Sequence, residues 1–323
     1  MEEDRMQENI FFSLVVATVG RTKELQQFLL SVAELPSKNF EVILVDQNSD
    51  DRVADLVPLF TDKLHLVHCK IEQKNASKAR NAGAALATGS WIGFPDDDCE
   101  YTPDTMQKVQ GVITEHAPDV VTGTVLDFDG RPLNRFLLNR CKVSLLNFIG
   151  KVSEPALFIR KEIFEQLGGF NEDFGPGGKY FSSESYELAV RALTQKIDIQ
   201  FDAGIHILHP RVMPPFPDSY LKREYGYSYG FGMVLRKHFG WWAAVYLSKY
   251  ALVFTTKLFR FTGTRRAHAY VTASGLWDGL WHRKPKTAGC ASLTPPVLAP
   301  LAPAFNLPKP AADAIPQTQE AGR

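Results

Sequence analysis

The sequence predicts an α/β fold built on a mostly parallel sheet. The first observation is a set of three apolar, β-rich runs: FFSLVVAT (11–18), FEVILVD (40–46) and SWIGFPD (90–96). Each run is apolar on successive residues, a pattern typical of parallel strands that are covered on both faces. The second observation is that helix-like segments separate these runs. The order β-α-β-α-β therefore predicts a parallel sheet with right-handed crossovers.

The segments between the runs have the composition and spacing of helices. In TKELQQFLLSVAEL, between the first two runs, apolar side chains recur at helical spacing: Leu25, Phe28, Leu29 and Val32. ASKARNAGAALATG, which precedes the third run, predicts a second helix. Sheets of this kind bind ligands beyond the carboxyl ends of their strands, so polar residues at those ends are the first candidates for a site.

The composition excludes several classes of protein. With 323 residues, 45% of them hydrophobic and 22% charged, the chain can bury the core of one large domain with appendages. Lys plus Arg and Asp plus Glu number 36 each, so the charge balance predicts no nucleic-acid partner. Reduced thiols in a cytosolic compartment are favoured over disulfides or a zinc site, because four scattered cysteines have no CxxC spacing: Cys69, Cys99, Cys141 and Cys290.

The two ends of the sequence lack the patterns of folded elements. The acidic, polar segment MEEDRMQENI (1–10) predicts an N-terminal tail rather than a secretory signal. Residues 285–323 are rich in Pro and Ala and aperiodic, which predicts a disordered tail. Between them, no uninterrupted apolar run reaches the roughly 18 residues that indicate a membrane-spanning helix.

Three consecutive aspartates follow the third apolar run, in WIGFPDDDCEY. Asp96 and Asp98 are two residues apart, so on an extended chain their carboxylates project to the same side. Hard oxygen ligands in this arrangement suit Mg²⁺ or Mn²⁺. We interpret the cluster, with Asp97 between the two ligands, as a divalent-cation site that bridges to phosphates; a solvated acidic loop is the alternative.

Polar residues also follow the first two runs. Thr18 to Arg21 come after the first run, and Asp46 with QNSDD comes after the second. The Asp46 carboxylate can accept a hydrogen bond from a base N–H, although Asn-Ser-Asp-Asp is also ordinary turn chemistry. All three sets are expected to converge on one edge of the sheet.

Several segments together resemble a known family. SLVVATVGR, EVILVDQNSDD, SKARNAGAALATGSWIGFPDDDCEY, GGFNEDFGPGG and SSESYELAVRAL are similar, in order and spacing, to the landmarks of family 2 of the inverting nucleotide-sugar glycosyltransferases, which have the GT-A fold. The resemblance covers residues 11 to about 210 and implies a GT-A domain over residues 11–217.

The resemblance also implies roles for individual residues. The D-x-D element of the family falls on Asp96 and Asp98. Asp46 would contact the nucleobase, while Thr18 and Arg21 would line the nucleotide pocket. The nucleotide-sugar-binding set further includes Asp96 and Asp97. It also includes Arg80 of KARN, which would help to hold nucleotide or pyrophosphate. A charge on the surface of a helix is the alternative for Arg80.

The chemistry of such a transfer requires a base. A cation stabilises the leaving diphosphate, and inversion then needs a group that deprotonates the acceptor hydroxyl. The family usually supplies the aspartate of a Glu-Asp pair, but here Glu184 is followed by Ser185. The available carboxylates are Glu184, which we favour, and Glu187 one turn on. Ser182 or Ser183 is expected to cap this helix, and a capping role for one glutamate is the structural alternative.

Two further segments leave alternatives open. In GPGGKYF, Gly175, Gly177 and Gly178 allow a loop that closes over a ligand, or a static turn. In GIHILHP, His206 and His209 lie three residues apart on an apolar segment. Packing or phosphate contact is favoured for these histidines, with metal ligation by His209 as the alternative.

The region 218–284 has a different character. It is rich in aromatic residues, Lys and Arg, with almost no acids beyond Glu224 and Asp278. Basic residues interrupt its most apolar part, 241–261, at near-helical spacing: Lys249, Lys257 and Arg260. This pattern predicts helices that lie in a membrane interface rather than span the membrane. A helical pair packed on the preceding domain is the alternative.

Taken together, these patterns predict a metal-dependent inverting glycosyltransferase on the inner, cytoplasmic face of a membrane. It would move a sugar from a nucleotide-diphosphate sugar to a lipid-linked or saccharide acceptor, in polysaccharide or glycolipid assembly. The Gln-x-x-Arg-Trp signature of processive synthases is absent, which favours single addition. The alternatives are a non-catalytic nucleotide-sugar-binding protein and a sugar nucleotidyltransferase. The latter needs a Gly-rich loop after the first strand, where ATVGRTKEL has one glycine.

Overall fold

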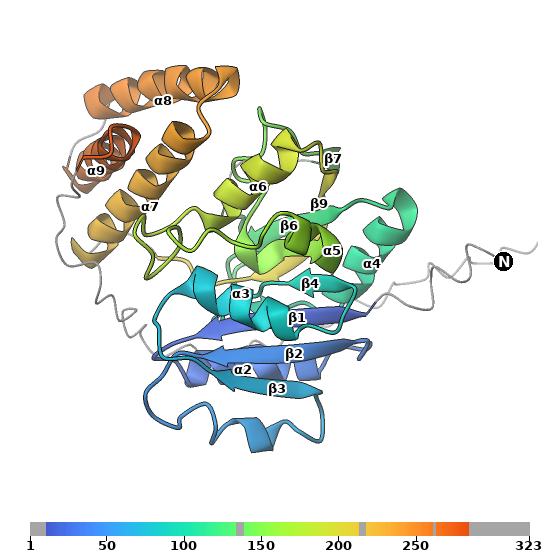
Figure 1. The fold of residues 1–323 in the computed structure, drawn as a ribbon. Helices are drawn as coiled ribbons and strands as arrows, with labels where there is room; N and C mark the ends of the chain where they lie inside the picture. Colours follow the sequence, from blue (N-terminus) through green and yellow to red (C-terminus); the bar gives the residue numbers. More distant parts are fainter. Residues whose placement is uncertain (1–10, 134–138, 213–217, 261–262, 284–323) are drawn as a thin grey trace, which may run out of the picture. The chain divides into compact units, whose positions relative to one another are not determined.

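A mixed sheet forms the centre of the computed structural model, which describes residues 11–133, 139–212, 218–260 and 263–283 (Figure 1). The strands of the described residues run in the order β3-β2-β1-β4-β8-β6-β9-β5, and β7 pairs with β9. Their bounds are β1 Phe12–Thr18, β2 Phe40–Asp46, β3 Leu66–Lys70, β4 Trp91–Gly93, β5 Glu100–Tyr101, β6 Val120–Leu126, β7 Cys141–Lys142, β8 Leu157–Arg160 and β9 Ile199–Leu208.

The helices flank this sheet and extend beyond it. Their bounds are α2 Lys23–Ala33, α3 Ala76–Leu86, α4 Thr105–His116, α5 Lys161–Gln166, α6 Glu184–Thr194, α7 Asp218–Lys237, α8 Trp241–Arg260 and α9 Gly263–Leu280, with two short 3₁₀ turns, Val57–Leu59 and Glu154–Ala156. The predicted tails, 1–10 and 285–323, lie outside the described residues.

The three predicted strands are confirmed as β1, β2 and β4, and the two predicted helices as α2 and α3. β1 pairs in parallel with both β2 and β4, and Thr18 lies opposite Asp46 at the carboxyl ends of β1 and β2. An isolated parallel bridge joins Ala17 to Asp96. The carboxyl ends of these strands therefore meet at one edge, as the sequence predicts.

The sheet is mixed rather than mostly parallel. β8 runs antiparallel to both of its neighbours, β4 and β6, and β9 pairs antiparallel with β5 and β7. The strands responsible are short, and no long apolar run marks β5, β7 or β8 in the sequence. The pattern of apolar runs that predicts β1, β2 and β4 therefore does not predict the antiparallel strands β5, β7 and β8.

Two apolar cores lie on opposite faces of the sheet. One contains the buried residues of α2 and α4, including the four predicted positions of α2. The other contains residues of α3, α5 and α6. In α3, Gly83 faces Val15 of β1 so closely that a larger side chain would overlap it. This close approach of α3 to the sheet fixes the place of Arg80, one turn earlier.

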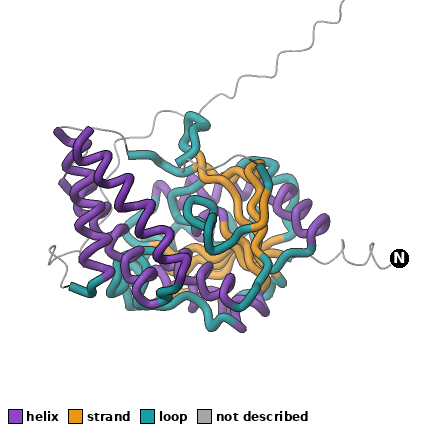
Figure 2. The backbone as a smooth tube through the Cα atoms, turned by 90° about the horizontal axis from the view of Figure 1, so that it is seen from above, coloured by secondary structure: helices purple, strands orange, loops and turns teal. Residues whose placement is uncertain are grey.

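The helices α7, α8 and α9 gather at one side of the sheet (Figure 2). α7 and α9 pack backbone against backbone, because Gly232, Gly275 and Gly279 face main-chain atoms of the opposite helix. A buried hydrogen bond from Tyr225 Oη to Asp278 Oδ2 (2.8 Å) joins the same two helices. Asp278, one of the few acids in this region, therefore has a structural role in the α7–α9 contact.

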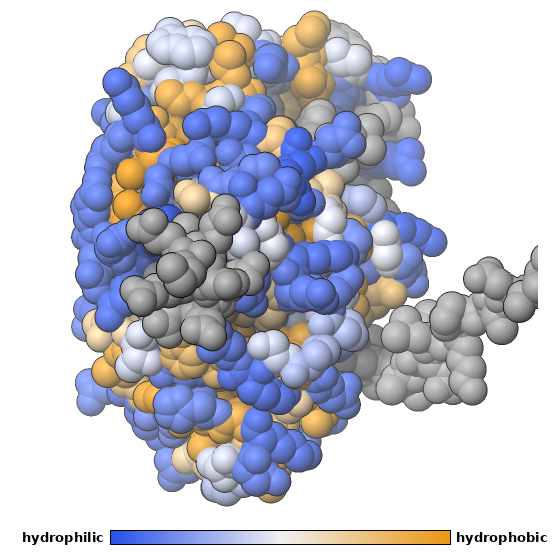
Figure 3. Space-filling model, turned by 90° about the vertical axis from the view of Figure 1, so that its right-hand side faces the viewer, coloured by the Kyte–Doolittle hydropathy of each residue, from blue (hydrophilic) through white to orange (hydrophobic). Residues whose placement is uncertain are grey.

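The inner faces of α7 and α8 pack on the core that contains α6, through Phe231, Val234, Trp242 and Tyr246 among others. For these faces the packed-helix alternative is correct. Large apolar side chains remain exposed elsewhere on the three helices and just beyond the ends of α7 and α9: Tyr227, Phe239, Trp241, Leu252, Val253, Tyr270, Trp277 and Trp281. Figure 3 shows hydrophobic groups at the level of α8, interspersed with hydrophilic ones. No described helix combines the length and apolar character that crossing a membrane requires.

Candidate active site

The three aspartates meet the end of β1 at the sheet edge. Thr18 Oγ1 donates to Asp97 Oδ2 (2.7 Å). The Arg21 guanidinium pairs with Asp97 and, through Nη2, with Asp98 Oδ2 (2.9 Å). The structure thus brings together residues that the sequence placed at the ends of two different strands.

The end of β2 is joined to the same edge by a network around Asp46, which has no exposed surface. Asp46 Oδ1 accepts from the backbone and side-chain nitrogens of Asn48 (both 2.8 Å), and Oδ2 lies 3.2 Å from His68 Nε2. Asn48 Oδ1 in turn accepts from Gly20 N (2.7 Å), where Gly20 has a positive φ of 74°. Asp46 holds the two loops together; its contact with a nucleobase stays a prediction.

The carboxylates of the triple aspartate differ in protonation behaviour. Burial raises the pKa of Asp97 to about 6, although the charge of Arg21 opposes it. Burial also raises the pKa of Asp96, against the effect of Arg80. For Asp98, burial is outweighed by His209 and Arg21, so its pKa is lowered. The cluster is therefore stabilised by three cationic side chains of the protein itself.

A candidate metal group lies within this cluster. Asp96, Asp98 and His209 each offer one ligand atom, and these atoms lie within 4.8 Å of one another. His209 follows β9 directly. Asp98 Oδ1 is buried without a hydrogen-bond partner, although His209 Nε2 is 3.3 Å away. Two carboxylates and an imidazole suit Mn²⁺, and a cation there would satisfy the orphaned oxygen.

The sequence favours packing or phosphate contact for His209, with metal ligation as the alternative. The structure places His209 beside the aspartates rather than in an apolar core. The charges of Asp98 and Asp96 outweigh burial and raise the pKa of His209 to about 9. His206 pairs with Thr124 in the sheet and accepts, through its carbonyl oxygen, from Thr105 Oγ1 (2.9 Å). The two histidines of the motif therefore have different surroundings.

Arg80 connects the aspartates to α6. It is 5% exposed, which excludes the alternative of a helix-surface charge. Nη2 donates to Asp96 Oδ1 and Nη1 donates to Glu184 Oε1, both at 2.8 Å. A single buried guanidinium thus links the first residue of α6 to the candidate metal group.

Glu184 is 4% exposed at the start of α6. Burial, followed by the charge of Glu154, raises its pKa to about 7, and Arg80 opposes this rise. A carboxylate with such a pKa is partly ionised at neutral pH and can accept a proton.

Glu154 is a residue of the site that sequence analysis missed. Its Oε1 accepts from the backbone N–H of Ser185 (3.2 Å), so it caps α6 from a 3₁₀ turn about thirty residues upstream. The expected capping by a serine is wrong: Ser183 is the N-cap residue, but its side chain caps no backbone N–H in the described structure. Ser182 Oγ donates instead to the carbonyl oxygen of Tyr227 (3.2 Å) on α7. A cap supplied from a distant turn leaves no local pattern.

Glu187, the second carboxylate of α6, lies in cationic surroundings. It has no exposed surface, and its oxygens lie 2.8 Å from Arg191 Nε, 3.1 Å from His238 Nε2 and 3.4 Å from Lys237 Nζ. Burial alone would raise its pKa, but His238 and Arg191 outweigh burial and, with Lys237, lower the pKa to about 2.

The glycine loop before α6 abuts the site. Pro176 O accepts from Ala76 N (2.9 Å), and Phe174 O accepts from Ser77 Oγ (2.8 Å), so the loop is fastened to the start of α3. Gly175 has a φ of 92°, and a Cβ there would lie 3.0 Å from Glu184 Cδ. The loop therefore forms part of the wall around Glu184.

Comparison with known proteins identifies the domain that this geometry belongs to. The family model described as "Glycosyl transferase family 2" matches residues 13–171. This stretch of the chain belongs to glycosyl transferase family 2. A "PGL/p-HBAD biosynthesis glycosyltransferase" of Mycobacterium tuberculosis is 32% identical over 167 residues, which are 50% of this chain and 63% of that relative. The match therefore spans less than two thirds of that relative's length.

A second relative and two solved structures agree with this assignment. The "Poly(ribitol-phosphate) beta-N-acetylglucosaminyltransferase TarS" of Staphylococcus aureus is 30% identical over 142 residues, 42% of this chain and 25% of TarS. The crystal structure of TarS 1–349 with UDP-GlcNAc has a TM-score of 0.55 at 17% identity, covering 84% of this chain and 92% of that one. The Pyrobaculum calidifontis mannosyltransferase PcManGT with GDP-Man and Mn²⁺ has a TM-score of 0.60 at 14% identity, covering 88% and 94%. These likenesses confirm the GT-A fold.

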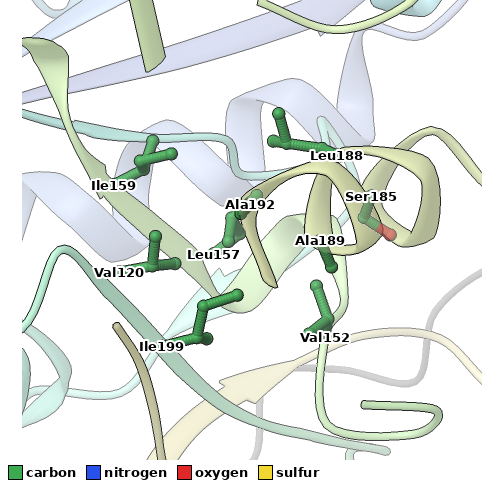
Figure 4. Close-up of a pocket in the computed structure, with 9 residues that line it drawn as sticks. All are labelled: Val120, Val152, Leu157, Ile159, Ser185, Leu188, Ala189, Ala192 and Ile199. Carbon is green, nitrogen blue, oxygen red and sulfur yellow. The ribbon is translucent and has the colours of Figure 1, made fainter. Parts of the chain in front are cut away.

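The departure from the usual family 2 pattern at Ser185 has a structural counterpart. Ser185 lines a small apolar cavity beneath α6, as Figure 4 shows. The other lining residues are Val120, Val152, Leu157, Ile159, Leu188, Ala189, Ala192 and Ile199. In this chain, position 185 therefore borders the core, while position 184 adjoins Arg80 and the aspartates.

Proposed function

We propose that this family 2 chain is a metal-dependent inverting glycosyltransferase with Glu184 as its catalytic base. The observation that carries the proposal is the bridge made by Arg80. It connects a buried carboxylate whose pKa is about 7 to a candidate ligand of the metal. A base and a cation-stabilised leaving group are the two requirements of inversion, and here they adjoin.

The donor is a nucleotide-diphosphate sugar. Support comes from the solved neighbours, whose complexes contain UDP, UDP-GlcNAc or GDP-Man. Thr18, Arg21 and Asp97 would line the nucleotide pocket, with Asp46 at the nucleobase and Arg80 near the pyrophosphate. Since Arg21 already pairs with two aspartates, it would place its charge between them and the donor phosphates.

The metal is Mg²⁺ or Mn²⁺. Asp96 and Asp98, with His209, would hold it, and when bound it would neutralise charge on the departing diphosphate. The mannosyltransferase neighbour contains Mn²⁺. A histidine ligand must be neutral to bind a cation, so loading would release the proton that His209 otherwise holds.

The proton transfer falls to Glu184. Arg80 binds Oε1, which orients the carboxylate and leaves Oε2 to accept the proton of the acceptor hydroxyl. The acceptor oxygen then attacks the sugar carbon from the face opposite the leaving diphosphate, and inversion follows. The opposing effects of Glu154 and Arg80 on the Glu184 pKa keep this base ionisable near neutral pH.

Glu187 has a structural role in this proposal. Its three partners are Arg191 of α6, Lys237 at the end of α7 and His238 in the turn that follows α7. They stabilise the ionised carboxylate so strongly that it would be a poor proton acceptor. Glu187 thus fastens α7 to α6 and does not exchange protons with the acceptor.

The acceptor is lipid-linked or a saccharide, in single-addition assembly of a glycolipid or polysaccharide. The names of the two relatives, which refer to PGL/p-HBAD and to poly(ribitol-phosphate), support this class. The chain would lie on the cytoplasmic face of a membrane. Support comes from exposed apolar and basic side chains of α8: Trp241, Leu252, Val253, Lys249 and Arg260.

This location has a direct test. Each basic residue near an anionic surface contributes on the order of 1 kcal/mol, screened by salt. Co-sedimentation with anionic vesicles should therefore exceed that with neutral vesicles and fall at high salt. Equal partition to both kinds of vesicle contradicts the location.

Two measurements test the function itself. The melting temperature should rise with UDP or GDP only when Mn²⁺ or Mg²⁺ is present. Labelled UDP-GlcNAc, UDP-glucose or GDP-mannose, incubated with a lipid extract of the source cells, should give a labelled product. Nucleotide binding without product from any donor favours the alternative of a non-catalytic nucleotide-sugar-binding protein, which Ser185 would suit. Failure to bind any nucleotide contradicts both. The single glycine of ATVGRTKEL leaves the sugar nucleotidyltransferase unsupported.

A further inference from the structure

Arg223 of α7 is held in an unusual way. Its guanidinium carbon lies 5.1 Å from the centre of the Tyr220 ring and 5.6 Å from that of the Tyr227 ring. These residues are three before and four after Arg223, so all three share one face of the helix. When a guanidinium stacks on an aromatic ring it uses its flat face, which leaves its in-plane N–H groups free to donate to another partner.

Among the described residues, Arg223 lacks the carboxylate partner that a buried arginine usually has. Nε is buried and has no hydrogen-bond partner. Among the described side chains, no carboxylate lies within 4.0 Å of Arg223. The adjacent Glu224 pairs instead with His268 of α9, at 3.2 Å. A positioned arginine with a buried, unsatisfied donor indicates a ligand that supplies the missing acceptor.

The face of α7 that carries Arg223 lies against the segment that leads into α6. Ser182 Oγ donates to the carbonyl oxygens of Gly226 (3.4 Å) and Tyr227 (3.2 Å). A Cβ on Gly226 would lie 3.3 Å from Phe181 Cβ. α7 is therefore fixed to Ser182, two residues before Glu184 at the start of α6; both helices are labelled in Figure 1.

Electrostatic effects agree with this placement. Tyr227 is 43% exposed, yet its hydroxyl lies in crowded surroundings. Burial is the main cause that raises the pKa of Tyr227; the charges of Glu184 and Asp96 add to the rise, and Arg223 opposes it. The Tyr227 hydroxyl therefore lies within the electrostatic influence of Glu184 and Asp96, while part of the side chain faces solvent.

We propose that Arg223, held between Tyr220 and Tyr227, is the acceptor-side oxyanion site: it binds a phosphate or carboxylate group that the acceptor carries. This inference rests on the proposed function, because it names the substrate class of the same site. Residues proposed for the donor belong to the carboxyl ends of β1 and β2, the segments after β1 and β4, and α3, whereas Arg223 belongs to α7. The two anions of the reaction would then be held by different elements, on either side of Glu184.

The test uses the full chain with its donor site occupied. UDP or GDP, whichever stabilises the protein more, is added to saturation with Mn²⁺, and binding of hexyl phosphate, hexanoate and hexyl glucoside is measured by calorimetry. One of the two anions should bind, and the neutral glycoside should not. Arg223→Gln should weaken that binding at least tenfold. Arg223→Lys keeps the charge but loses the planar fork, so its affinity for the anion should lie between those of wild type and Arg223→Gln.

The matched control is Lys222→Gln, which removes the same charge from the exposed neighbouring residue and should change binding less than twofold. Nucleotide binding should be unchanged in all three variants. Binding of the anions that is equal in wild type and Arg223→Gln overturns the inference, as does failure of both anions to bind to wild type. Equal binding of hexyl glucoside and the anions overturns it too.

The failure of this inference can be separated from failure of the proposed function. If Glu184→Gln abolishes sugar transfer while Arg223→Gln changes neither anion binding nor KM for the acceptor, the inference alone fails. If wild type transfers no sugar but binds the anion through Arg223, the oxyanion site stands and the assignment of the reaction fails.

Discussion

Glu184 and Glu187 lie one turn apart at the start of α6, and both are buried, but their electrostatic surroundings are opposite. Near Glu184 a carboxylate, Glu154, opposes the single cation Arg80, and the pKa is about 7. Near Glu187 two cations, Arg191 and Lys237, converge with the imidazole of His238, and the pKa is about 2. Burial acts in the same direction on both residues. The partners, which come from other elements, decide which carboxylate can accept a proton and which one fastens the helices.

The candidate metal group is connected to Glu184 through Arg80. Arg80 connects Glu184 to Asp96, which with Asp98 forms the pair of proposed carboxylate ligands. Asp98→Ala should lower turnover by about 10³-fold, since the charge on the leaving group is no longer stabilised. The melting temperature should also no longer rise when nucleotide and Mn²⁺ are added together. Turnover close to that of wild type contradicts the metal assignment.

Substituting the other carboxylate should damage the fold instead. Glu187→Gln removes one partner from a buried charge network and should cost on the order of 3 kcal/mol of unfolding free energy. The pKa of Glu187 is lowered from 4.5 to about 2, so its contribution is present above pH 4.5 and is lost as the pH falls through 2. Urea unfolding at pH 7 and at pH 3 checks this: the difference from wild type should shrink at the lower pH. Destabilisation that is equal at both pH values contradicts the charge network as its cause.

Restoring the usual family residue should not restore a better base. Ser185 lines an apolar cavity, so Ser185→Asp would place a carboxylate near Val152 and Leu157, and should lower stability by about 2 kcal/mol. Turnover per folded molecule should not increase. Ser185→Ala, which tolerates apolar surroundings, is the control and should leave both quantities nearly unchanged. A marked gain in turnover for Ser185→Asp would show that position 185 reaches the acceptor.

The smallest expected effect is at Glu154. Its charge raises the pKa of Glu184, so Glu154→Gln should move the acid limb of the pH–rate profile to lower pH, while the maximal rate changes little. Gln keeps an oxygen that can accept from Ser185 N, so the cap of α6 remains. Glu162→Gln, at an exposed position of α5, is the matched control. An unmoved acid limb contradicts the coupling between the two carboxylates.

Part of the site could be predicted because it depends on local pattern. The runs at 11–18, 40–46 and 90–96 predict parallel strands, and parallel strands have their carboxyl ends at the same edge of the sheet. The convergence of Thr18, Asp46 and Asp97 on one edge therefore follows from the sequence, and their contacts in the structure confirm it.

The remainder depends on contacts between distant segments. Glu154 caps α6 from another turn, and His209 reaches Asp98 from the far end of β9. Neither contact leaves a periodicity, and the apolar, strand-like segment that carries the two histidines favours ordinary packing or phosphate contact for them. Likewise, only the structure distinguishes Glu184 from Glu187, because spacing alone places both on one face of α6.

The most direct test of the central claim compares Glu184→Gln with Glu187→Gln in one assay. Each variant is scored for nucleotide binding with Mn²⁺ and for turnover per folded molecule, across pH 5 to 9. Since the Glu184 pKa is about 7, turnover of wild type and of Glu187→Gln should rise with pH through that value. Glu184→Gln should bind nucleotide normally, lose about 10²-fold or more in rate, and lack this rise. Full activity in Glu184→Gln, or an unchanged pH dependence, would contradict its assignment as the base.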